Sequence, residues 1–569
     1  MRRRLTPQQA LVVDAAEHGV LVRACPGAGK TTTAARRLGA LSEGIHPGRH
    51  VVGLSFTRAG ANELARAVSE AVPGLLSSGR VLVSTVDSFL DRFIVRPFAH
   101  QVFKTSHPLR VVTEPSVVHR ATAAFHVGAA KDRTGAWDID ARYRGDWTVE
   151  LAVRGRQRPP AHAPARNAVA NWFRAGHYSH RHRAFLASTC LRKLPFLCSA
   201  LQARLAHLLI DEFQDTSAQQ QHVLEFLHTA CQVPTTVLGD PNQSIYAFRG
   251  ANPAGFHRPA SEWGCVPLRL ETSFRCSETI ASLLSALAPA DRVVGRPDSQ
   301  EAPMPVGVVH PTDDFAHALS RFKEVLDIHQ IPRSDAVVLV RGHQQLAGLV
   351  RSQAENLTGL AKMLGQAASK RDTERDLFGA TKEVFRALQH VGVDSGLMAP
   401  AALGHPDLAD SASALRQAVC SFVAGGARGL PPASLNVDEW VPLAKLGFEH
   451  LCASLGLDSS SLNLGRRITR RGKLDLKRPV ASGALDGWDV RTIHSSKGLT
   501  FRAVLVLGSG QFMTKATGQA GTGTLDGEES RLLYVGLSRA HTLLCWGIPR
   551  STHRRHERLL ATLPLDISL

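Results

Sequence analysis

Residues 20–33, VLVRACPGAGKTTT, place a glycine-bearing loop between a short apolar run and a stretch of helical composition. Val20–Val22 is expected to form a buried strand. Gly27 and Gly29 have no side chain, so the backbone there can approach phosphate oxygens closely. Ala24 stands where the usual phosphate-loop pattern has its first glycine. Strand, loop and helix together predict an α/β nucleotide-binding fold, because a helix N-terminus directs free N–H groups at an anion.

Two polar pairs supply the chemistry that such a loop requires. Lys30 follows the loop and would reach the β- and γ-phosphates, and the Thr31 hydroxyl would hold Mg²⁺. Much further along, the apolar run 205–210 leads into Asp211 and Glu212. Adjacent carboxylates at the end of a buried strand are costly unless they are used. We expect Asp211 to hold Mg²⁺ opposite Thr31 and Glu212 to activate the attacking water, in preference to an accidental acidic turn.

Further apolar runs at 49–56, 81–84 and 235–238 are expected to be strands that alternate with helices, which implies a parallel sheet with its sites at the strand carboxyl ends. Hydroxyl, basic and aromatic residues follow these runs and would grip a sugar-phosphate backbone or stack on bases. Ordinary loop chemistry and core packing are the alternatives for each stretch taken alone. The residues concerned are Phe56, Thr57, Arg58, Thr85, Tyr246, Phe248 and Arg249, with Gln243 placed to sense the γ-phosphate.

Charge indicates a polyanionic partner. The 569 residues carry a formal net charge of +18, for which nucleic acid is the commonest explanation and an indifferent basic surface the alternative. Residues 151–210 contain no Asp or Glu, and they predict a surface that follows a nucleic-acid backbone. A histidine metal site is a weaker reading of the same segment. The residues are Arg154, Arg156, Arg158, Arg174, His177, Tyr178, His180, Arg181, His182 and Arg183, with Trp172 and Phe173 interleaved.

Other classes of protein are disfavoured. Nine cysteines are scattered without a C-x-x-C pair, which argues against a zinc ribbon or a disulfide framework. No apolar run approaches the roughly 20 residues that cross a bilayer, and no signal core follows the basic start. We therefore expect a cytoplasmic protein with no membrane partner.

Read together, the motifs resemble those of UvrD/Rep-type superfamily 1A DNA helicases, in collinear order along nearly the whole chain. The segments 24–31, 211–216 (DEFQDT) and 239–251 are similar to motifs I, II and III. The remaining matches are 5–9 to the Q motif, 56–66 to motif Ia, 84–89 to motif Ib, 268–277 to motif IV, 490–501 to motif V and 528–540 to motif VI.

The resemblance implies two RecA-like parallel-sheet P-loop NTPase domains with mainly helical insertions. We expect domain 1A at 1–95 and 201–267, insertion 1B at 96–200, domain 2A at 268–350 and 480–569, and a reduced insertion 2B at 351–479. The end of 2B is basic and is either a duplex contact or a solvated face. Asp475-Leu-Lys477 faintly resembles a nuclease motif, but it lacks upstream carboxylates.

The same resemblance implies the site residues, with ATP and Mg²⁺ as cofactors. Arg275 and Arg539 would reach the γ-phosphoryl group, where an arginine is worth about 10³–10⁵ in rate in GTPases. The catalytic set is Glu212, Lys30, Arg275, Arg539 and Gln243, and Thr31 and Asp211 hold the metal. The nucleotide-binding set is Gln9, Pro26, Gly27, Ala28, Gly29, Lys30, Thr31, Thr32, Phe274, Arg275, Gly498 and Arg539, and His494 joins the DNA-binding residues.

The expected function is ATP-driven 3′-to-5′ translocation on single-stranded DNA and unwinding of tailed duplex, in repair, recombination or phage defence. The alternative is a DNA-stimulated ATPase subunit that works with a nuclease or another protein. Three departures from the family pattern, at Thr32, Phe274 and Thr500, lead us to expect a looser preference for ATP.

Overall fold

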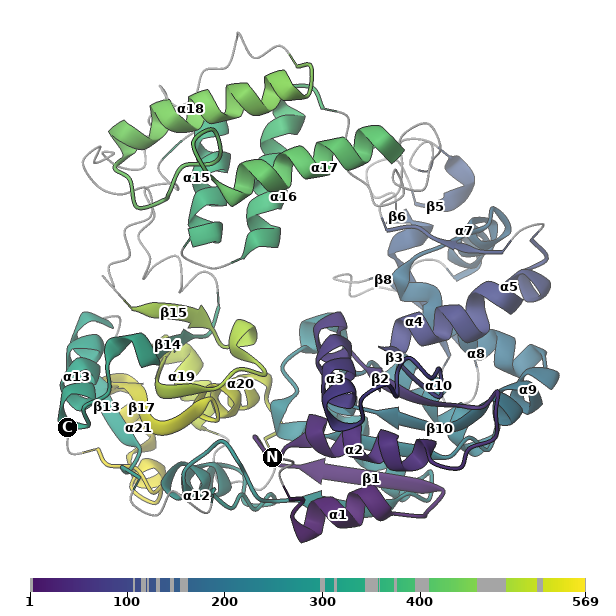
Figure 1. Ribbon diagram of the computed structural model, residues 1–569, viewed down its shortest axis with the longest axis horizontal. Coiled ribbons are helices and arrows are strands. Elements are labelled where there is room, and N and C mark those ends of the chain that lie inside the picture. The colour runs from purple at the N-terminus through teal and green to yellow at the C-terminus, as the bar shows by residue number, and fades with distance from the viewer. Residues whose placement is uncertain are drawn as a thin grey trace. The chain divides into compact units, whose positions relative to one another are not determined.

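The computed structural model forms two compact units (Figure 1). The first comprises residues 1–303, 518–538 and 562–564, and the second comprises residues 304–517, 539–561 and 565–569. The structure describes residues 4–105, 108–113, 119, 122–128, 134–143, 148–153, 162–296, 302–311, 315–342, 357, 359–372, 376–393, 409–457, 488–518 and 525–567. Arg154, Arg156, Arg158, the basic end of the predicted 2B insertion and Asp475–Lys477 lie outside these residues.

The first unit is built on a six-stranded sheet in the order β12-β1-β11-β10-β2-β3, in which every neighbouring pair is parallel. β1, β2, β10 and β11 are buried along nearly their whole length, as expected for a parallel sheet covered by helices, whereas the edge strand β12 is mostly exposed. This confirms the predicted α/β class. The strands are β1 (Gly19–Ala24), β2 (His50–Ser55), β3 (Val81–Thr85), β10 (Leu205–Ile210), β11 (Thr235–Gly239) and β12 (Val266–Leu270).

Most helices of the first unit lie between these strands along the chain, whereas α1 precedes the first strand and α12 and α20 follow the last (Figure 1). Several begin at a side chain that accepts a hydrogen bond from an otherwise unpaired N–H group, such as Thr57 before α3 and Ser217 before α10. The helices are α1 (Pro7–Asp14), α2 (Lys30–Ser42), α3 (Arg58–Ala71), α4 (Val86–Leu90), α10 (Ala218–Thr229), α11 (Arg258–Ser261), α12 (Glu278–Leu287) and α20 (Glu528–Leu537). The 3₁₀ turns η5 (Phe213–Asp215), η6 (Pro241–Gln243), η7 (Ala247–Arg249) and η8 (Pro253–His257) lie between them.

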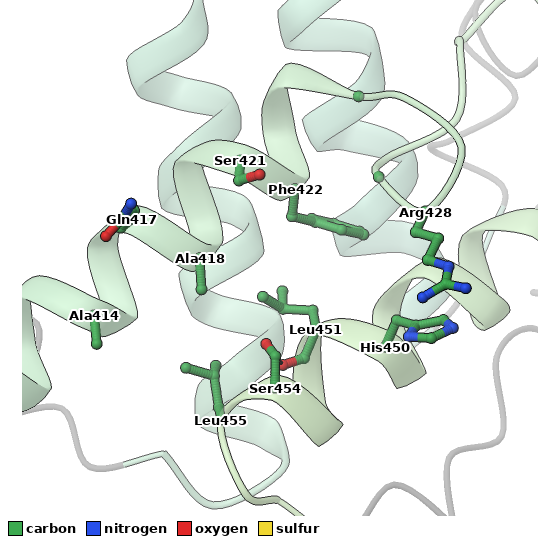
Figure 2. Close-up of a pocket in the computed structure, with 12 residues that line it drawn as sticks. Ala414, Gln417, Ala418, Ser421, Phe422, Arg428, His450, Leu451, Ser454 and Leu455 are labelled. Carbon is green, nitrogen blue, oxygen red and sulfur yellow. Dashed lines mark hydrogen bonds between the residues drawn. The ribbon is translucent and has the colours of Figure 1, made fainter.

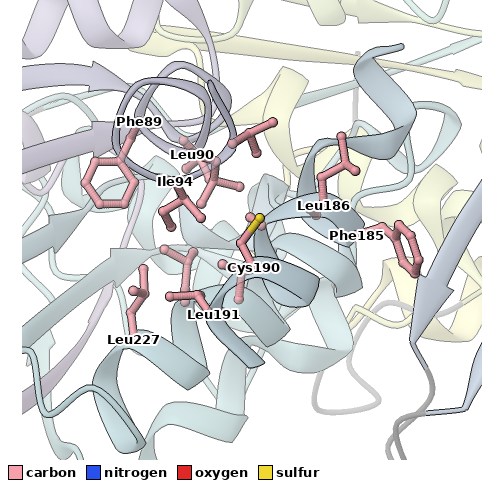
Figure 3. Close-up of a cluster of buried hydrophobic side chains, with 14 of the residues drawn as sticks. Phe89, Leu90, Ile94, Phe185, Leu186, Cys190, Leu191 and Leu227 are labelled. Carbon is pink, nitrogen blue, oxygen red and sulfur yellow. The ribbon is translucent and has the colours of Figure 1, made fainter. Parts of the chain in front are cut away.

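The inserted segment after β3 shares one hydrophobic core with the sheet. Figure 3 shows Phe89, Leu90 and Ile94 gathered with Leu191 of α8 and Leu227 of α10. The elements here are η1 (Asp91–Val95, a π-helix), α5 (Arg96–Phe103), β4 (Arg110–Val111), η2 (Ala123–Phe125), β5 (His126–Val127), β6 (Thr134–Gly135), η3 (Ala136–Asp138), β7 (Ile139–Tyr143), β8 (Val149–Val153), α7 (His162–Arg174), β9 (His177–Tyr178), η4 (His180–His182), α8 (Arg183–Lys193) and α9 (Phe196–Arg204).

The prediction that residues 151–210 form one basic, aromatic surface is wrong for five of the nine described residues singled out. Trp172, Phe173, Tyr178, His182 and Arg183 are buried. The Tyr178 hydroxyl donates to Asp91 Oδ1 at 2.7 Å, and Arg183 Nε donates to Asp91 Oδ2 at 2.7 Å. Aromatic rings among basic residues therefore pack a core here, and the arginine neutralises a buried carboxylate.

The histidines of the same segment do not form the metal site that was weighed as an alternative. His182 is fully buried, with Nδ1 near Ser179 and Nε2 at 2.9 Å from the Ile139 carbonyl oxygen. Burial lowers the pKa of His182 to about 4, so its imidazole is neutral. Across the part of the chain that the structure describes, no group of three His, Cys, Asp or Glu side chains is arranged to hold a metal ion by itself.

The second unit contains a five-stranded parallel sheet in the order β13-β17-β16-β14-β15. A separate hydrophobic core fills one face of it and includes Phe322, Leu505 and Leu543. The strands are β13 (Val306–His310), β14 (Ala336–Val340), β15 (Asp489–Thr492), β16 (Phe501–Leu507) and β17 (Ala540–Pro549). The helices are α13 (Phe315–Ile328), α19 (Gly510–Thr517) and α21 (Arg550–Leu560), with the 3₁₀ turns η9 (Arg333–Asp335) and η13 (His494–Ser496).

Four helices of the second unit have a core of their own, around Trp440 and Phe448. They are α15 (Gly359–Asp372), α16 (Leu377–His390), α17 (Ala409–Ala424) and α18 (Val437–Ser454). Figure 2 shows Phe422 of α17 and Leu451 of α18 beside a cavity of about 540 Å³ that Arg428 and His450 also line. The helical composition of this region agrees with the 2B insertion expected at 351–479.

The boundaries of the two units fall at different residues from the boundaries of the four predicted domains. β12 runs across residue 268, where domain 2A was expected to begin, because Val266–Leu270 pairs with β1. Helix α20, which was also assigned to 2A, belongs to the first unit. The four-domain division stays a prediction.

Two further sequence expectations concern cysteines and membranes. Cys198 of α9 and Cys231 form a disulfide, and the other seven cysteines are free thiols. Among the described helices, none alone is long and apolar enough to span a bilayer, although the bent pair His180–Lys193 and Phe196–Arg204 passes by length and composition.

Candidate functional site

The loop after β1 has the backbone of a phosphate-binding loop. Gly27 and Gly29 adopt positive φ angles of 76° and 74°, a conformation that favours glycine. A Cβ atom at Gly27 would lie 2.6 Å from the Cβ of Arg275. Lys30 is the first residue of α2, so the free N–H groups of this helix face the loop. The strand, loop and helix expected at residues 20–33 are confirmed.

Gln9 of α1 forms a hydrogen bond with the phosphate loop. Its Nε2 donates to the Ala28 carbonyl oxygen at 3.1 Å, and its Oε1 accepts from the Thr6 N–H at 3.1 Å. Thr6 in turn caps α1 by accepting from the Gln9 N–H at 3.2 Å. Both ends of the Gln9 amide therefore engage protein groups, and contact with an adenine edge stays a prediction.

The two carboxylates expected at the end of β10 differ in environment. Asp211 is only 4% exposed, and burial together with the neighbouring Glu212 charge raises its pKa, against the opposing effect of Lys30. Glu212 is half-buried and has a φ of 55°, in the left-handed region that is strained for a residue with a side chain. Its N–H donates to Asp211 Oδ1 at 2.9 Å. Backbone strain of this kind clusters at active sites.

Gln214 links Glu212 to the end of the neighbouring strand. It is fully buried, and its Nε2 donates to Glu212 Oε2. Its Oε1 accepts from the Asp240 N–H at 3.0 Å, and its backbone oxygen accepts from the Ser244 hydroxyl at 3.0 Å. The sequence analysis did not single out Gln214. The signal was its place inside DEFQDT, but its partners only become evident in three dimensions.

Asp240 forms the third carboxylate of the site. It is buried, which raises its pKa to about 6, and Lys30 counteracts this rise. Gln243 Nε2 donates to Asp240 Oδ2 at 2.6 Å. Because Lys30 acts on both Asp211 and Asp240, one cation neutralises part of a cluster that would otherwise be too costly to bury.

The segment expected to be motif IV lies directly on the phosphate loop. The Phe274 N–H donates to the Gly27 carbonyl oxygen at 2.8 Å, and the Ser273 hydroxyl donates to the Pro26 carbonyl oxygen at 2.7 Å. Arg275 Nη1 donates to the Ser538 carbonyl oxygen at 3.3 Å, and burial lowers the pKa of its guanidinium. Phe274 and Arg275 therefore meet the loop within the first unit, and Ser273 is a contact that the sequence analysis missed.

Helix α20 completes the first-unit site from far along the chain. Arg531 Nε donates to the Ser244 carbonyl oxygen at 2.8 Å, and its Nη1 donates to the Leu525 carbonyl oxygen at 2.9 Å. Tyr534 is buried close enough to Asp240 for that carboxylate to raise its pKa, after the larger effect of burial. Arg531 and Tyr534 were not predicted as site residues, although both lie inside the quoted motif.

Three predicted residues belong to the second unit. Arg539 is 1% exposed at the start of β17, and its carbonyl oxygen accepts from the Phe501 N–H at 3.0 Å. His494 begins the turn η13, and Gly498 has a φ of 88° shortly after it. Their proposed roles at the nucleotide and on DNA stay predictions.

The predicted DNA-contact residues of the first unit lie at strand carboxyl ends. The ring centroids of Phe56 and Tyr246 are 6.1 Å apart, and those of Tyr246 and Phe248 are 6.0 Å apart with planes inclined at 62°. Phe248 is 48% exposed. Because Tyr246 and Phe248 are two residues apart, their rings are expected to face the same way on an extended segment. That expectation is wrong, because η7 turns the chain at Ala247–Arg249 and the rings meet edge to face. The side chain of Arg249 lies outside the description.

The remaining predicted contacts, Thr57, Arg58 and Thr85, stand at helix starts. The Thr57 hydroxyl accepts from the Gly60 N–H at 2.9 Å, and the Thr85 hydroxyl accepts from the Ser88 N–H at 3.1 Å. Both hydroxyls therefore cap helices. Arg58 is exposed at the first position of α3.

Comparison with known proteins agrees with this geometry. The model of the UvrD/REP helicase N-terminal domain matches residues 5–140 and 169–262, and the UvrD-like helicase C-terminal domain matches residues 484–548. The chain belongs to the UvrD/Rep family of ATP-dependent DNA helicases. The N-terminal match spans the phosphate loop, both carboxylate-bearing strand ends and the aromatic residues.

Individual UvrD/Rep relatives cover different shares of this helicase. The ATP-dependent DNA helicase UvrD2 of Mycobacterium tuberculosis is 27% identical over 595 residues, covering 97% of this chain and 80% of its own. The ATP-dependent DNA helicase Rep of Escherichia coli is 23% identical over 296 residues, covering 50% and 43%. The Gabija protein GajB of Bacillus cereus is 23% identical over 343 residues, covering 59% of each chain.

Proposed function

We propose that this chain uses ATP hydrolysis to move 3′ to 5′ along single-stranded DNA and to unwind tailed duplex. One observation carries the proposal: Glu212, Gln214 and Asp240 form a single hydrogen-bonded chain beside the phosphate loop. Gln243 in turn donates to Asp240, and the exposed aromatic Phe248 follows five residues later. This arrangement supports a nucleotide site after β10 and a base-stacking surface in the loop after β11.

Each residue of the site has a stated task in the proposal. Lys30 and the loop N–H groups bind the phosphates, and Glu212 accepts a proton from the attacking water. Arg275 and Arg539 stabilise the charge that develops on the γ-phosphoryl group, and Gln243 responds to its presence. Gln9, Phe274, Thr32 and Gly498 contact the base or sugar.

Mg²⁺ fits the donors that are present. The Thr31 hydroxyl and the Asp211 carboxylate are hard oxygen ligands, and Mg²⁺ usually takes one or two such ligands together with substrate phosphates and water. Bound there, it would neutralise phosphate charge. The buried Asp211 carboxylate, with its raised pKa, would gain from a second positive charge close to Lys30.

Movement on DNA would follow from cycles of ATP binding and hydrolysis. Bases stack on Phe56, Tyr246 and Phe248, where aromatic stacking is worth about 1–3 kcal/mol per base. Thr57, Arg58, Thr85, Arg249 and His494 are proposed to contact the sugar-phosphate backbone. Repair, recombination and phage defence are the proposed settings, and the cytoplasm is the proposed location.

The alternative is a DNA-stimulated ATPase subunit that unwinds poorly without a protein partner such as a nuclease. The reduced insertion expected at 351–479 suits this version. Strand displacement by the purified chain separates the two proposals.

The direct test is unwinding of duplexes with a 3′ or a 5′ single-stranded tail at equal concentrations. The proposal predicts displacement from the 3′-tailed duplex with ATP and none with a non-hydrolysable analogue. Preferential opening of the 5′-tailed duplex contradicts the polarity. DNA-stimulated hydrolysis without displacement favours the subunit.

Nucleotide choice tests the three departures from the family pattern. Because Thr32, Phe274 and Thr500 replace groups that contact base and sugar in the family, kcat/KM should fall less from ATP to GTP or dATP than in a conventional member. If the ratio of kcat/KM for ATP to kcat/KM for GTP or dATP is the same in the two enzymes, this proposal is wrong.

A further inference from the structure

Few of the described residues that were singled out in the basic segment 151–210 are exposed. Arg174, His180 and Arg181 are exposed, whereas Tyr178, His182 and Arg183 are buried. Arg174 Nη1 donates to Asn171 at the end of α7. His180 and Arg181 instead stand side by side in η4, at the edge of a cavity.

This cavity of about 550 Å³ lies between three segments of the first unit. Val112 and Thr113 come from the end of β4, Trp137 and Asp138 from η3, and Ser179, His180 and Arg181 from the turn after β9. A volume of this size is typical of small-ligand sites, which span about 300–1,000 Å³.

Several contacts hold the cavity walls together. The Val112 N–H donates to the Tyr178 carbonyl oxygen at 2.7 Å. Arg181 Nη1 lies 3.1 Å from Asp140 Oδ1, and His182 bonds the Ile139 carbonyl. The walls therefore belong to one packed body and do not depend on a single loop.

Trp137 forms the aromatic wall. It is half-buried, with its ring centroid 5.5 Å from that of Trp172 and 5.1 Å from that of His126. A Cβ atom at Gly135 would lie 2.2 Å from the Trp137 ring, so glycine is required for the ring to take this place. An aromatic ring supported from behind and open to a cavity is a stacking surface.

The cavity is linked to one of the predicted DNA contacts of the first unit. Arg183, which directly follows η4, donates from Nη1 to Asp87 Oδ2 at 2.7 Å, and Asp87 lies in α4, the helix that Thr85 caps. Arg58 and the segment that begins at Thr85 were assigned to single-stranded DNA. A strand held there would pass beside the cavity.

We propose that the cavity receives one nucleobase of single-stranded DNA, stacked on Trp137, with Arg181 contacting the adjoining phosphate. The inference rests on the proposed DNA translocase function and adds to it a base site in the inserted segment. Stacking accepts any base, because every base has a π-face. Asp138 adds a preference for bases with an exocyclic amine, which thymine lacks.

The test measures the Kd of labelled single-stranded 20-mers for the full chain by anisotropy, with ATPase assays alongside. Trp137→Ala is expected to raise the Kd about 5- to 100-fold, the range for loss of one stacked base. Arg181→Ala should raise it several-fold and lower the slope of log Kd against log salt by about 0.7. kcat at saturating DNA should stay within about two-fold, because these residues are remote from the phosphate loop.

Arg174→Ala is the matched control, since Arg174 is an exposed arginine of the same segment that does not line the cavity. Its Kd should stay within about two-fold of the unsubstituted chain. Asp138→Asn should reduce the preference for a dC 20-mer over a dT 20-mer. A 5-iodouracil placed along the strand should crosslink to Trp137 at one position.

Equal weakening by Arg181→Ala and Arg174→Ala would show general electrostatic attraction and overturn the proposal. So would an unchanged Kd for Trp137→Ala, or crosslinks that avoid Trp137. If Trp137→Ala fails to fold by circular dichroism, the Arg181 and Arg174 pair and the crosslink still decide. Failure of the base site leaves DNA-stimulated ATPase and unwinding intact, whereas failure of the proposed function removes both from the unsubstituted chain.

Discussion

The two parallel sheets of this molecule end in opposite chemistry. At the carboxyl ends of the first sheet, β10 is followed by Asp211 and Glu212, and β11 by Asp240, beside Lys30. At the carboxyl ends of the second sheet, β14 is followed by Arg341 and β17 by Arg550. Among its described strand ends, none is followed directly by a carboxylate.

The difference shows that sheet architecture alone does not make a catalytic site. Both sheets contain a strand, a glycine-containing loop and a helix in succession, β1 to α2 in one and β16 to α19 in the other. Only the first has Lys30 to balance buried carboxylates whose pKa values are raised by burial. Arginines at the second sheet suit contact with phosphates but provide no base and no metal ligand.

The largest expected effect concerns ATP hydrolysis, and it compares a substitution after the β1 loop with one after the β16 loop. Lys30→Ala should lower ATP hydrolysis at least about 100-fold, because the phosphates and two buried carboxylates lose their shared cation. Gln511→Ala, at the second position of α19, should leave it within about two-fold. Steady-state ATPase assays with saturating DNA measure both. A comparable loss in the two variants would remove the distinction between the sheets.

The next effect concerns the link between neighbouring strand ends. Gln214→Ala should lower kcat about 10-fold with little change in the KM for ATP, because Glu212 loses its positioning partner while the loop is intact. Gln219→Ala is the control, since Gln219 bonds the backbone of Tyr143 instead. A raised KM with normal kcat would mean that Gln214 serves binding and does not position the base.

A smaller effect concerns stability, through a histidine of the first sheet. His207 on β10 is buried against Thr236, and burial lowers its pKa to about 3. Since the unfolded imidazole titrates near 6.5, its contribution is complete above that pH and is lost as pH falls toward 3. From pH 7 to pH 5 the free energy of unfolding should fall by about 2 kcal/mol from this group.

Urea unfolding at the two pH values, compared with His207→Gln, isolates that contribution. The variant should lose less stability on acidification than the unsubstituted chain. An identical pH dependence of the two proteins would show that His207 is protonated in the fold or already neutral in the unfolded state.

Sequence reasoning predicted the local structure correctly where its signals are contiguous. Gly27 to Thr31 and Asp211–Glu212 each lie within a few residues, beside the strand and helix signals of β1, α2 and β10. The α/β class followed from the same alternation of apolar runs and helices.

It failed where partners are distant or a pattern has two meanings. Gln214, Ser273 and Arg531 act through groups that only the fold brings close. Rings among arginines fit a DNA-binding surface and a core equally well, so Trp172 was assigned to the surface although it is buried. The turn η7 changed the relation of Tyr246 to Phe248, because periodicity over three residues does not separate a strand from a 3₁₀ turn.

The central claim is that Glu212, at the carboxyl end of β10, activates the water that cleaves ATP. Single-turnover hydrolysis by Glu212→Gln in the presence of single-stranded DNA tests it, with ATP and DNA affinities measured in parallel. The account predicts that the hydrolysis rate falls at least about 100-fold, while the affinities for ATP and for DNA stay within about two-fold of those of the unsubstituted chain. Hydrolysis at the unsubstituted rate would contradict it.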